Sequence, residues 1–277
     1  MMEVFSSAVS EKRIFKVDDG KHRLTSDRVV VEEPLEIRIQ YFFNNKWQKK
    51  NLAITMRTPG NDIALTLGFL LAEGIIASKS GIEAIEQLEI NILIVKFLKT
   101  TKVDLTALDR NFYATASCGV CGKASIETLA KTACFFPQKD LPKIDYSVLL
   151  ELPKLLRGSQ SVFEETGGIH AAGLFSPTGV LLDYAEDVGR HNAVDKLIGN
   201  CLQKDLIPLR AQILMLSGRV SFELVQKAMM AGIPIIAAVG APSSLAIELA
   251  EENGMTLIGF LRGERFNVYS GVGRIRI

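Results

Sequence analysis

The sequence predicts an α/β protein, with a buried parallel sheet in its second half and a smaller α+β unit in its first half. In the second half, short apolar runs alternate with helical segments and glycine-containing turns, which is typical of βαβ units. In the first half, several segments alternate apolar and polar residues with the period of half-buried strands. A chain of 277 residues, 48% of them hydrophobic, is long enough to bury a substantial core.

The first half is predicted to hold three strands and one helix. Residues 35–41 and 52–56 alternate like strands, and the sequence "NNK" between them is a turn signal. After the loop "RTPGND", residues 62–74 predict an apolar helix that ends at Gly74. Residues 88–98 alternate again and predict a third strand. These elements together predict a small unit built around a meander.

A linker is predicted between the two halves. Residues 131–145 contain two prolines and little periodicity, and we therefore place a domain boundary there, between residues 1–140 and 141–277. The segment 147–158 that follows predicts a helix. Pro153 is expected to kink or split this helix, because proline lacks a backbone N–H and its ring clashes with the preceding turn.

The second half begins with a predicted β-hairpin across residues 168–185, whose turn is "SPTG". A helix follows, and its apolar residues fall on one stripe. After the helix, strands and helices alternate to the end of the predicted sheet. The predicted elements after the hairpin are helix 189–204, strand 211–217, helix 222–232, strand 233–239, helix 243–254 and strand 256–261.

The overall charge and the cysteine content limit the class of protein. The formal net charge is +1, so binding of nucleic acid through bulk positive charge is not expected. The first residues lack the apolar core of a signal peptide, and the most apolar stretches are too short and too interrupted to span a bilayer. Four cysteines in a chain of this length do not make a disulfide scaffold. We therefore expect a cytoplasmic protein.

Three junctions after predicted strands could bind anions. Residues 217–219 and 240–244 each follow a strand and open a helix, where exposed N–H groups and the helix dipole favour negative charge. Arg262 and Arg265 flank Gly263 after the last long strand, a combination that suits a phosphate or pyrophosphate. None of the three matches the Rossmann or Walker fingerprints, and each could equally be an ordinary connection with a solvated arginine.

Two histidines stand beside other polar residues. His170 lies on a predicted strand, and His191 lies at a predicted helix start with Asp187 and Arg190. Such a group could perform acid–base chemistry or contact a ligand. It could equally brace the start of the helix, because an aspartate near a helix N-terminus needs no further role. The sequence leaves both interpretations open.

The stretch "ATASCGVCGK", residues 114–123, contains Cys118 and Cys121. A structural zinc site needs four protein ligands and a catalytic site three, whereas this pair supplies two. Cys201 lies on the apolar stripe of its helix and Cys134 precedes two phenylalanines, so both are expected in the core. A zinc site is therefore not favoured, and we predict no bound metal.

Two further chemistries of a cysteine pair do not fit the sequence order. The zinc deaminases carry H-x-E before P-C-x-x-C, but here the cysteines precede His170 and Ala172 replaces the glutamate. A thioredoxin-like dithiol would follow the first strand of a compact βαβ unit, whereas this pair lies in the middle of the chain.

A nucleophilic thiol fits the surroundings of the pair better. Residues 123–133 predict a helix, so Cys121 stands near its N-terminus and beside Lys123. The helix dipole and the adjacent cation both favour the thiolate, which is the reactive form. Gly119 and Gly122 leave the sulfurs accessible. An accessible, activated thiol suits a carrier that visits a donor and then an acceptor.

The motifs together resemble the FdhD family, the formate dehydrogenase accessory sulfurtransferases. The resemblance extends from about Arg57 to Tyr269, and the combination of "SCGVCG" with "EDVGRHNAVDK" is specific. The other matching segments are "RTPGND", "LGFLLAEGII", "TGGIHAAGL", "SGRVSFELVQKA", "APSSLAIELA" and "GFLRGERFNVY".

The resemblance implies a function and a fold. Family members take sulfur from a cysteine desulfurase as a persulfide and pass it to the molybdenum or tungsten bis-pterin guanine dinucleotide cofactor of formate dehydrogenase. Cys118 matches the persulfide-bearing position, and Cys121 matches the second cysteine of the motif. The family's second half has a cytidine-deaminase-like, three-layer α/β/α fold without its zinc chemistry. Members are typically dimeric and cytoplasmic.

The resemblance also implies where the cofactor binds. The matching segment follows the last predicted strand and includes the two arginines noted above. It consists of Phe260, Leu261, Arg262, Gly263, Glu264 and Arg265.

Overall fold

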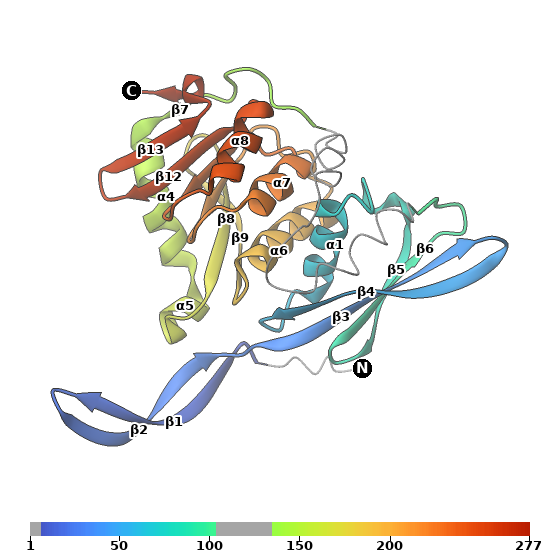
Figure 1. The fold of residues 1–277 in the computed structure, drawn as a ribbon, viewed down its shortest axis with the longest axis horizontal. Helices are drawn as coiled ribbons and strands as arrows, with labels where there is room; N and C mark the ends of the chain where they lie inside the picture. The colour runs from blue at the N-terminus through green and yellow to red at the C-terminus, as the bar shows by residue number, and fades with distance from the viewer. Residues whose placement is uncertain (1–6, 104–134) are drawn as a thin grey trace.

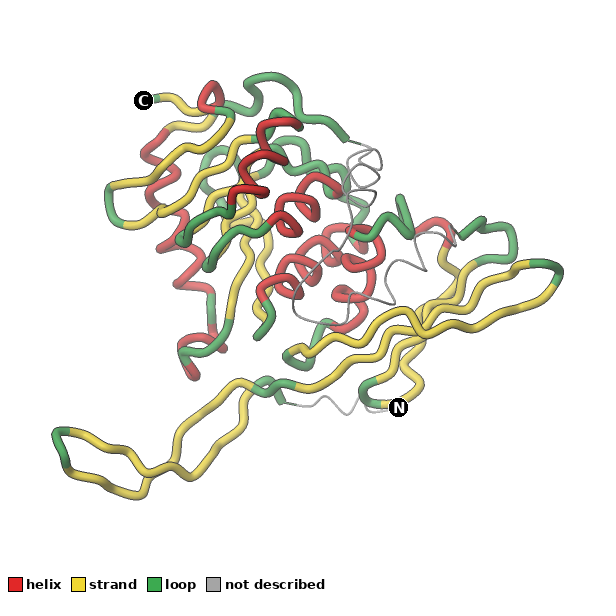
Figure 2. The backbone as a smooth tube through the Cα atoms, viewed as in Figure 1, coloured by secondary structure: helices red, strands yellow, loops and turns green. Residues whose placement is uncertain are grey.

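The computed structural model describes residues 7–103 and 135–277. The described part contains two larger β-sheets, with helices between them and on the outer face of one (Figure 1). Strands dominate its N-terminal portion, whereas strands and helices alternate in its C-terminal portion (Figure 2). The predicted mixed α/β composition is therefore confirmed.

An antiparallel hairpin formed by β1 (Val9–Asp18) and β2 (Lys21–Val30) projects away from the rest of the molecule, at the lower left of Figure 1. Its turn contains Asp19 and Gly20, both with positive φ, as a tight two-residue hairpin turn requires. The base of the hairpin touches α5 through an ion pair between Arg28 and Glu165 at 2.8 Å. This hairpin was not predicted from the sequence.

The N-terminal sheet has four strands in the order β4-β3-β6-β5. The predicted strands 35–41 and 52–56 are confirmed within β3 (Glu33–Phe43) and β4 (Lys46–Arg57). The prediction of one strand over 88–98 is wrong. β5 (Ile82–Glu89) ends at a turn and β6 (Ile92–Phe97) returns antiparallel to it, so the apparent alternation crosses a hairpin.

Helix α1 (Asp62–Ala72) covers the inner face of this sheet and packs directly on α6 (Arg190–Gln203) of the second half. A Cβ at Gly68 would collide with the backbone of Asp195, and a Cβ at Gly199 would collide with the backbone of Ala64. Both glycines therefore permit the close approach of the two helices. As a result, one hydrophobic core extends from the N-terminal sheet to the C-terminal sheet.

The C-terminal sheet has six strands in the order β13-β12-β11-β10-β8-β9. Its central strands β10, β11 and β12 are parallel, as predicted, and the predicted hairpin over 168–185 is confirmed as β8 and β9. The strands are β8 (His170–Phe175), β9 (Leu181–Asp187), β10 (Ile213–Leu216), β11 (Ile235–Ala238), β12 (Thr256–Arg262) and β13 (Arg265–Ser270).

Helices cover both faces of the C-terminal sheet (Figure 1). On one face lie α6, α7 (Phe222–Met230) and α8 (Ser244–Glu252), and each of these segments was predicted to be a helix. On the other face lies α4 (Tyr146–Ser159), followed by the short α5 (Ser161–Thr166). The remaining elements are the two-stranded pair β7 (Ile144–Asp145) and β14 (Ile275–Arg276) and the 3-10 turns η1 (Lys79–Gly81) and η2 (Val272–Arg274).

Helix α4 continues through Pro153, so the predicted split of this helix does not occur. Leu149, Leu152 and Leu156 on its inner face are fully or almost fully buried. Burial of each leucine stabilises the fold by about 1.5–3 kcal/mol. The three leucines together therefore contribute more than the cost of about 3 kcal/mol for a proline inside a helix. The packing of the helix therefore overrides the local preference of proline.

Within the ranges that the structure describes, no helix has both the length and the apolar character needed to cross a membrane.

Candidate functional site

The cysteine motif lies outside the described residues. Cys118, Cys121 and the whole predicted loop 114–123 fall between the two described ranges, as does Cys134. Their assigned roles therefore remain predictions from the sequence. Cys201 is described and is fully buried in the core, as predicted, and burial raises the pKa of its thiol to about 11.

The turns that follow β10 and β11 meet at the carboxyl edge of the sheet. The Gly240 N–H donates to the Gly218 carbonyl at 3.1 Å, and the Val220 N–H donates to the Ala241 carbonyl at 3.0 Å. A Cβ at Gly240 would lie 2.8 Å from the Arg219 nitrogen, so only glycine permits this approach. Two of the three predicted anion-binding junctions are therefore neighbours in space.

The third junction, at residues 260–265, is the tip of the β12–β13 hairpin rather than a strand-to-helix connection. Arg262 and Arg265 pair across the hairpin and are exposed, so their side chains leave the same face of the tip. Leu261 is fully buried. The Phe260 N–H donates to the Gly240 carbonyl at 3.1 Å, which ties this hairpin to the neighbouring turn.

Asp187 organises the segment "EDVGRHN". It is fully buried, pairs with Lys196 at 2.7 Å, and accepts hydrogen bonds from the Gly189 N–H at 2.8 Å and the Asn192 amide at 3.1 Å. It also accepts one from the Thr58 N–H at 3.2 Å. Asp187 thus braces the start of α6, which is one of the two roles that the sequence left open.

Thr58 of the "RTPGND" loop connects the first half of the chain to this brace. Its carbonyl accepts a hydrogen bond from Lys196 Nζ at 2.7 Å, and its hydroxyl accepts one from the Val188 N–H at 3.1 Å. The neighbouring Arg57 is 1% exposed and donates two hydrogen bonds to Asp62, at 2.9 and 2.8 Å. The two sequence motifs therefore form one buried polar junction between α1 and α6.

His191 has a different environment from Asp187. Its Nε2 lies 3.0 Å from both Ser221 Oγ and Glu223 Oε2. Burial, followed by the charges of Lys227 and Arg190, lowers the pKa of His191 to about 4. The imidazole is therefore neutral near pH 7.

His170 begins β8 and lies opposite Asp187 in the β8–β9 pairing. A Cβ at Gly218 would lie 3.2 Å from His170 Nδ1, so this ring stands beside the turn after β10. Burial and the charge of Arg190 hold the pKa of His170 below its ordinary value. The structure thus brings His170 and the predicted junction at 217–219 together.

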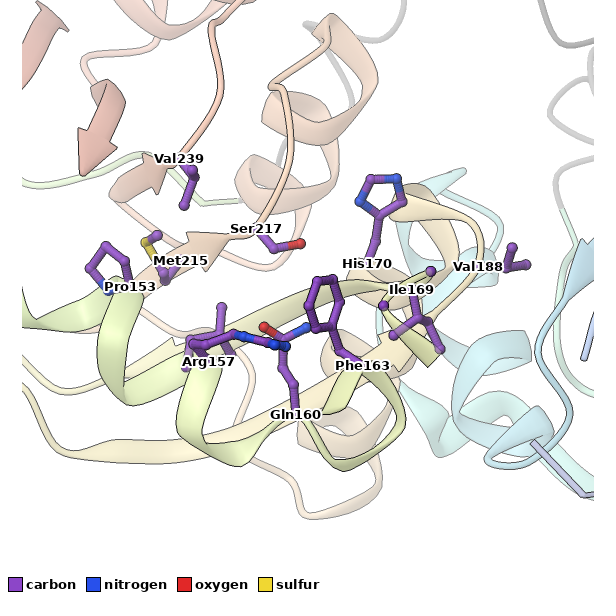
Figure 3. Close-up of a pocket in the computed structure, with 13 residues that line it drawn as sticks. Pro153, Arg157, Gln160, Phe163, Ile169, His170, Val188, Met215, Ser217 and Val239 are labelled. Carbon is purple, nitrogen blue, oxygen red and sulfur yellow. The ribbon is translucent and has the colours of Figure 1, made fainter. Parts of the chain in front are cut away.

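A cavity of about 510 Å³ opens beside His170, between α4, α5 and the carboxyl edge of the sheet (Figure 3). Its size lies in the range of small-molecule sites. Its lining residues are Pro153, Leu156, Arg157, Gln160, Phe163, Gly167, Gly168, Ile169, His170, Val188, Met215, Ser217 and Val239. The hairpin tip 260–265 does not belong to this lining.

The cavity combines apolar walls with a few polar groups. Arg157 stacks on Phe163, with the guanidinium carbon 3.7 Å from the ring centroid. The Phe163 N–H donates to Glu186 at 3.0 Å, and this carboxylate also accepts from the Val162 N–H at 3.1 Å, so it anchors α5. Gln160 is 4% exposed. Such a cavity can hold a planar molecule that needs few polar contacts.

The residues of this cavity that come from α4, α5 and the connection between them were not predicted from the sequence. Arg157, Gln160 and Phe163 belong to a segment with no recognisable motif, and they become neighbours of His170 only when α4 packs on the sheet. In the described portion of the chain, no group of three or more His, Cys, Asp or Glu side chains could hold a metal ion.

The fold is that of an α/β protein with a cavity at the carboxyl edge of its C-terminal sheet. The model of the FdhD/NarQ family matches residues 30–276, and the chain belongs to this family.

Relatives extend over nearly the whole chain. The chain is 47% identical to the sulfur carrier protein FdhD of Streptomyces coelicolor, over 97% of this chain and 96% of that protein. It is 46% identical to the protein of the same name from Sulfolobus acidocaldarius, over 96% and 98% of the two chains.

A solved structure has a similar fold. The crystal structure of a putative formate dehydrogenase accessory protein from Desulfotalea psychrophila matches with a TM-score of 0.73 and 25% identity. The match covers 98% of this chain and all of that one.

Proposed function

We propose that this protein is a sulfur carrier that acts through a persulfide on Cys118. The main support for this proposal is the similarity of the chain, over 96–97% of its length, to proteins named sulfur carrier protein FdhD. Cys118 and Cys121 of the CxxC motif are the only two cysteines of the sequence that are separated by as few as two residues. Cys201 is too deeply buried to replace them.

The loading step is a thiol–disulfide type of exchange. The Cys118 thiolate attacks the terminal sulfur of a persulfide on a cysteine desulfurase, so that the donor's sulfur–sulfur bond breaks and its cysteine leaves as a thiolate. Cys118 then carries the transferred sulfur as its own persulfide. Lys123 and the predicted helix start favour the attacking thiolate.

The delivery step uses Cys121. When the acceptor is bound, the Cys121 thiolate attacks the inner sulfur of the Cys118 persulfide, and the terminal sulfur leaves as hydrosulfide for the acceptor. The two cysteines are then joined as a disulfide, and a dithiol reductant reopens it before the next cycle. The acceptor is the molybdenum or tungsten bis-pterin guanine dinucleotide cofactor of formate dehydrogenase, bound here as a substrate.

The segment from Phe260 to Arg265 is our proposed contact for the dinucleotide phosphates. Support comes from the two guanidinium groups of Arg262 and Arg265, which are exposed and leave one face of the hairpin tip. The adjoining turn at Gly240 adds closely approaching backbone at the same edge of the sheet.

We also propose the finer organisation that the family resemblance implies. Residues 1–140 are one domain, and residues 141–277 are a cytidine-deaminase-like domain without zinc chemistry. The strand order and the helices on both sheet faces support this assignment, as does Ala172 in place of the catalytic glutamate. The protein functions in the cytoplasm as a homodimer.

Formate dehydrogenase activity in cells tests this function. In a host that lacks its own carrier, the wild-type chain is expected to restore activity, whereas Cys118→Ala is not. Cys201→Ala, which removes a buried thiol of the core, is the matched control and should restore activity. Full activation by Cys118→Ala would contradict the carrier and favour the second candidate, a non-catalytic chaperone that only binds the cofactor.

Metal analysis of the purified protein tests another alternative, a structural zinc module. If the purified protein contained stoichiometric zinc that a Cys118→Ala, Cys121→Ala double variant lost, the cysteines would be ligands rather than sulfur carriers.

A further inference from the structure

The projecting β1–β2 hairpin, residues 9–30, which we call the arm, has an apolar face and a basic face near its tip. Phe15 lies opposite Leu24, and Val17 projects from the same face of the ribbon. These three side chains are 63% to 71% exposed. The other face carries Lys16 and Arg23, which lie directly opposite each other. The arm is therefore amphipathic, and its apolar face is uncovered in the described chain.

The arm has little to stabilise it within one copy of the chain. An isolated two-stranded hairpin is marginal in water, and like charges that face each other, as Lys16 and Arg23 do, weaken it further. Outside its own two strands, the main contacts of the arm with described residues are at its base, where Arg28 pairs with Glu165 of α5. These features favour an arm whose tip packs against a second surface.

A complementary surface lies on the outer face of the N-terminal sheet, opposite α1. Ile54 and Met56 of β4 are 57% and 48% exposed on this face. Ile54 lies opposite Glu36 of β3, since the residues on either side of Glu36 point into the core. The same row continues through Ile92 of β6 to Glu89 of β5. We call Glu36, Ile54, Met56 and Glu89 the outer patch.

The arm and the outer patch are complementary in both polarity and charge. The arm offers apolar side chains with two cations behind them, and the outer patch offers apolar side chains with two carboxylates beside them. Glu36 also pairs with Arg38 at 2.9 Å, so Glu89 supplies the net negative charge of the patch. A membrane surface fits the arm less well, because Lys16 and Arg23 lie on the face opposite the apolar side chains.

The position of the arm favours contact with a second copy of the chain. Only residues 31 and 32 separate β2 from β3, so the arm and the outer patch adjoin in each copy. The arm nevertheless points away from its own sheet (Figure 1). A twofold axis beside this junction would bring each arm onto the patch of the other copy, and such an exchange closes at two copies.

We propose that two copies of this chain exchange their arms, so that the apolar face of each arm packs on the outer patch of the other copy. This inference rests on the proposed function, to which it adds the contact surface of the homodimer. The long side chains of Lys16 and Arg23 bend round the edges of the narrow ribbon towards the carboxylates of the patch. Nearly all of the arm precedes residues 30–276, which the family model matches.

Sedimentation equilibrium of the full-length chain tests the arm. We expect the double variant Phe15→Ser, Leu24→Ser to raise the dimer Kd by about tenfold or more, because central apolar side chains dominate such contacts. Its melting temperature as a dilute monomer should stay close to wild type, since both side chains are exposed. The matched control is Val180→Ser, Leu206→Ser, which replaces two side chains of similar exposure away from both surfaces and should leave the Kd unchanged.

A second double variant, Ile54→Ser, Met56→Ser, tests the outer patch. It should weaken the dimer in the same way as the arm variant. A mixture of the two variants should form a heterodimer more readily than either variant forms its own dimer, because one intact arm then meets one intact patch. Packing of the two arms on each other would instead leave the patch variant as tight a dimer as the wild type.

Three results would overturn the proposal: a wild-type chain that is monomeric at every concentration, an arm variant that dimerises like wild type, or a patch variant that does so. Sulfur loading of Cys118, measured in the same wild-type sample, separates the two proposals. A monomeric chain that still takes up sulfur overturns the arm exchange alone, whereas an arm-exchanged dimer that takes up none overturns the proposed function alone.

Discussion

The buried pair of Asp187 and Lys196 should be among the most sensitive points of the fold. Asp187 is fully buried and the Lys196 side chain is 3% exposed, and Asp187 Oδ2 lies 2.7 Å from Lys196 Nζ. Replacing Lys196 by methionine leaves a carboxylate in the interior without its counter-charge. Loss of one partner of a buried pair costs about 3–5 kcal/mol.

The lower end of this range is expected for Lys196→Met. Asp187 would keep the N–H donors of Thr58 and Gly189 and the amide of Asn192, which continue to stabilise the carboxylate. The Thr58 carbonyl, however, would lose its bond to Lys196. The free energy of unfolding should therefore fall by about 3 kcal/mol.

Urea denaturation at pH 7, followed by circular dichroism, measures this loss. The control is Lys79→Met, because Lys79 and Asp205 also lie 2.7 Å apart but their side chains are 41% and 74% exposed. An exposed pair contributes less than about 1 kcal/mol. If Lys196→Met costs no more than Lys79→Met, the assignment of this junction as the brace between the two halves is wrong.

Three further predictions concern other parts of the structure. On acidification, His191→Gln should lose less stability than the wild type. The pKa of His191 in the folded protein is about 4, below the ordinary value of 6.5. The contribution of the neutral imidazole to the free energy of unfolding is therefore fully present above pH 6.5 and is lost as the pH falls towards 4. The difference between the two unfolding free energies should change by about 2 kcal/mol after allowance for partial exposure, and a constant difference across pH 4–7 would contradict it. Gly68→Ala should destabilise by at least about 2 kcal/mol in thermal or urea unfolding because its Cβ meets the Asp195 backbone, whereas Gly158→Ala, with open space around it, should be neutral or stabilising. Equal effects of the two substitutions would be inconsistent with the helix contact. Peptide mapping after alkylation should find Cys201 modified only in unfolded protein, and rapid labelling of the native chain would show that its burial is incorrectly assigned.

The sequence was sufficient to predict the strands of the C-terminal sheet except β13. Its parallel strands are short apolar runs separated by helices. These strands are apolar throughout because helices cover both faces of the sheet. The N-terminal sheet was predicted less well. The turn at Ile90 and Asn91 interrupts an alternating run without glycine or proline, so periodicity alone joined two antiparallel strands.

The projecting β1–β2 hairpin had a usable signal. Asp19-Gly20 between alternating segments is a typical two-residue hairpin turn, and the positive φ of both residues agrees with it. The strands on either side are rich in charged residues, which concealed their alternation.

The candidate site also contains residues that the sequence could predict and residues that it could not. His170 and the turns at 217–219 and 240–244 follow from the rule that ligands bind at the carboxyl ends of parallel strands. Gln160 could not have been selected, because an isolated glutamine between two helices has no distinguishing pattern. Its place in the cavity is a property of the packed structure.

Intact-protein mass spectrometry measures sulfur transfer to Cys118 directly. The full-length chain is incubated with a cysteine desulfurase and cysteine, and the added mass is then localised by peptide mapping without reductant. We expect one added sulfur atom on Cys118 in the wild type and in Cys201→Ala, and none in Cys118→Ala. A Cys118→Ala chain that still gains one sulfur atom would contradict it.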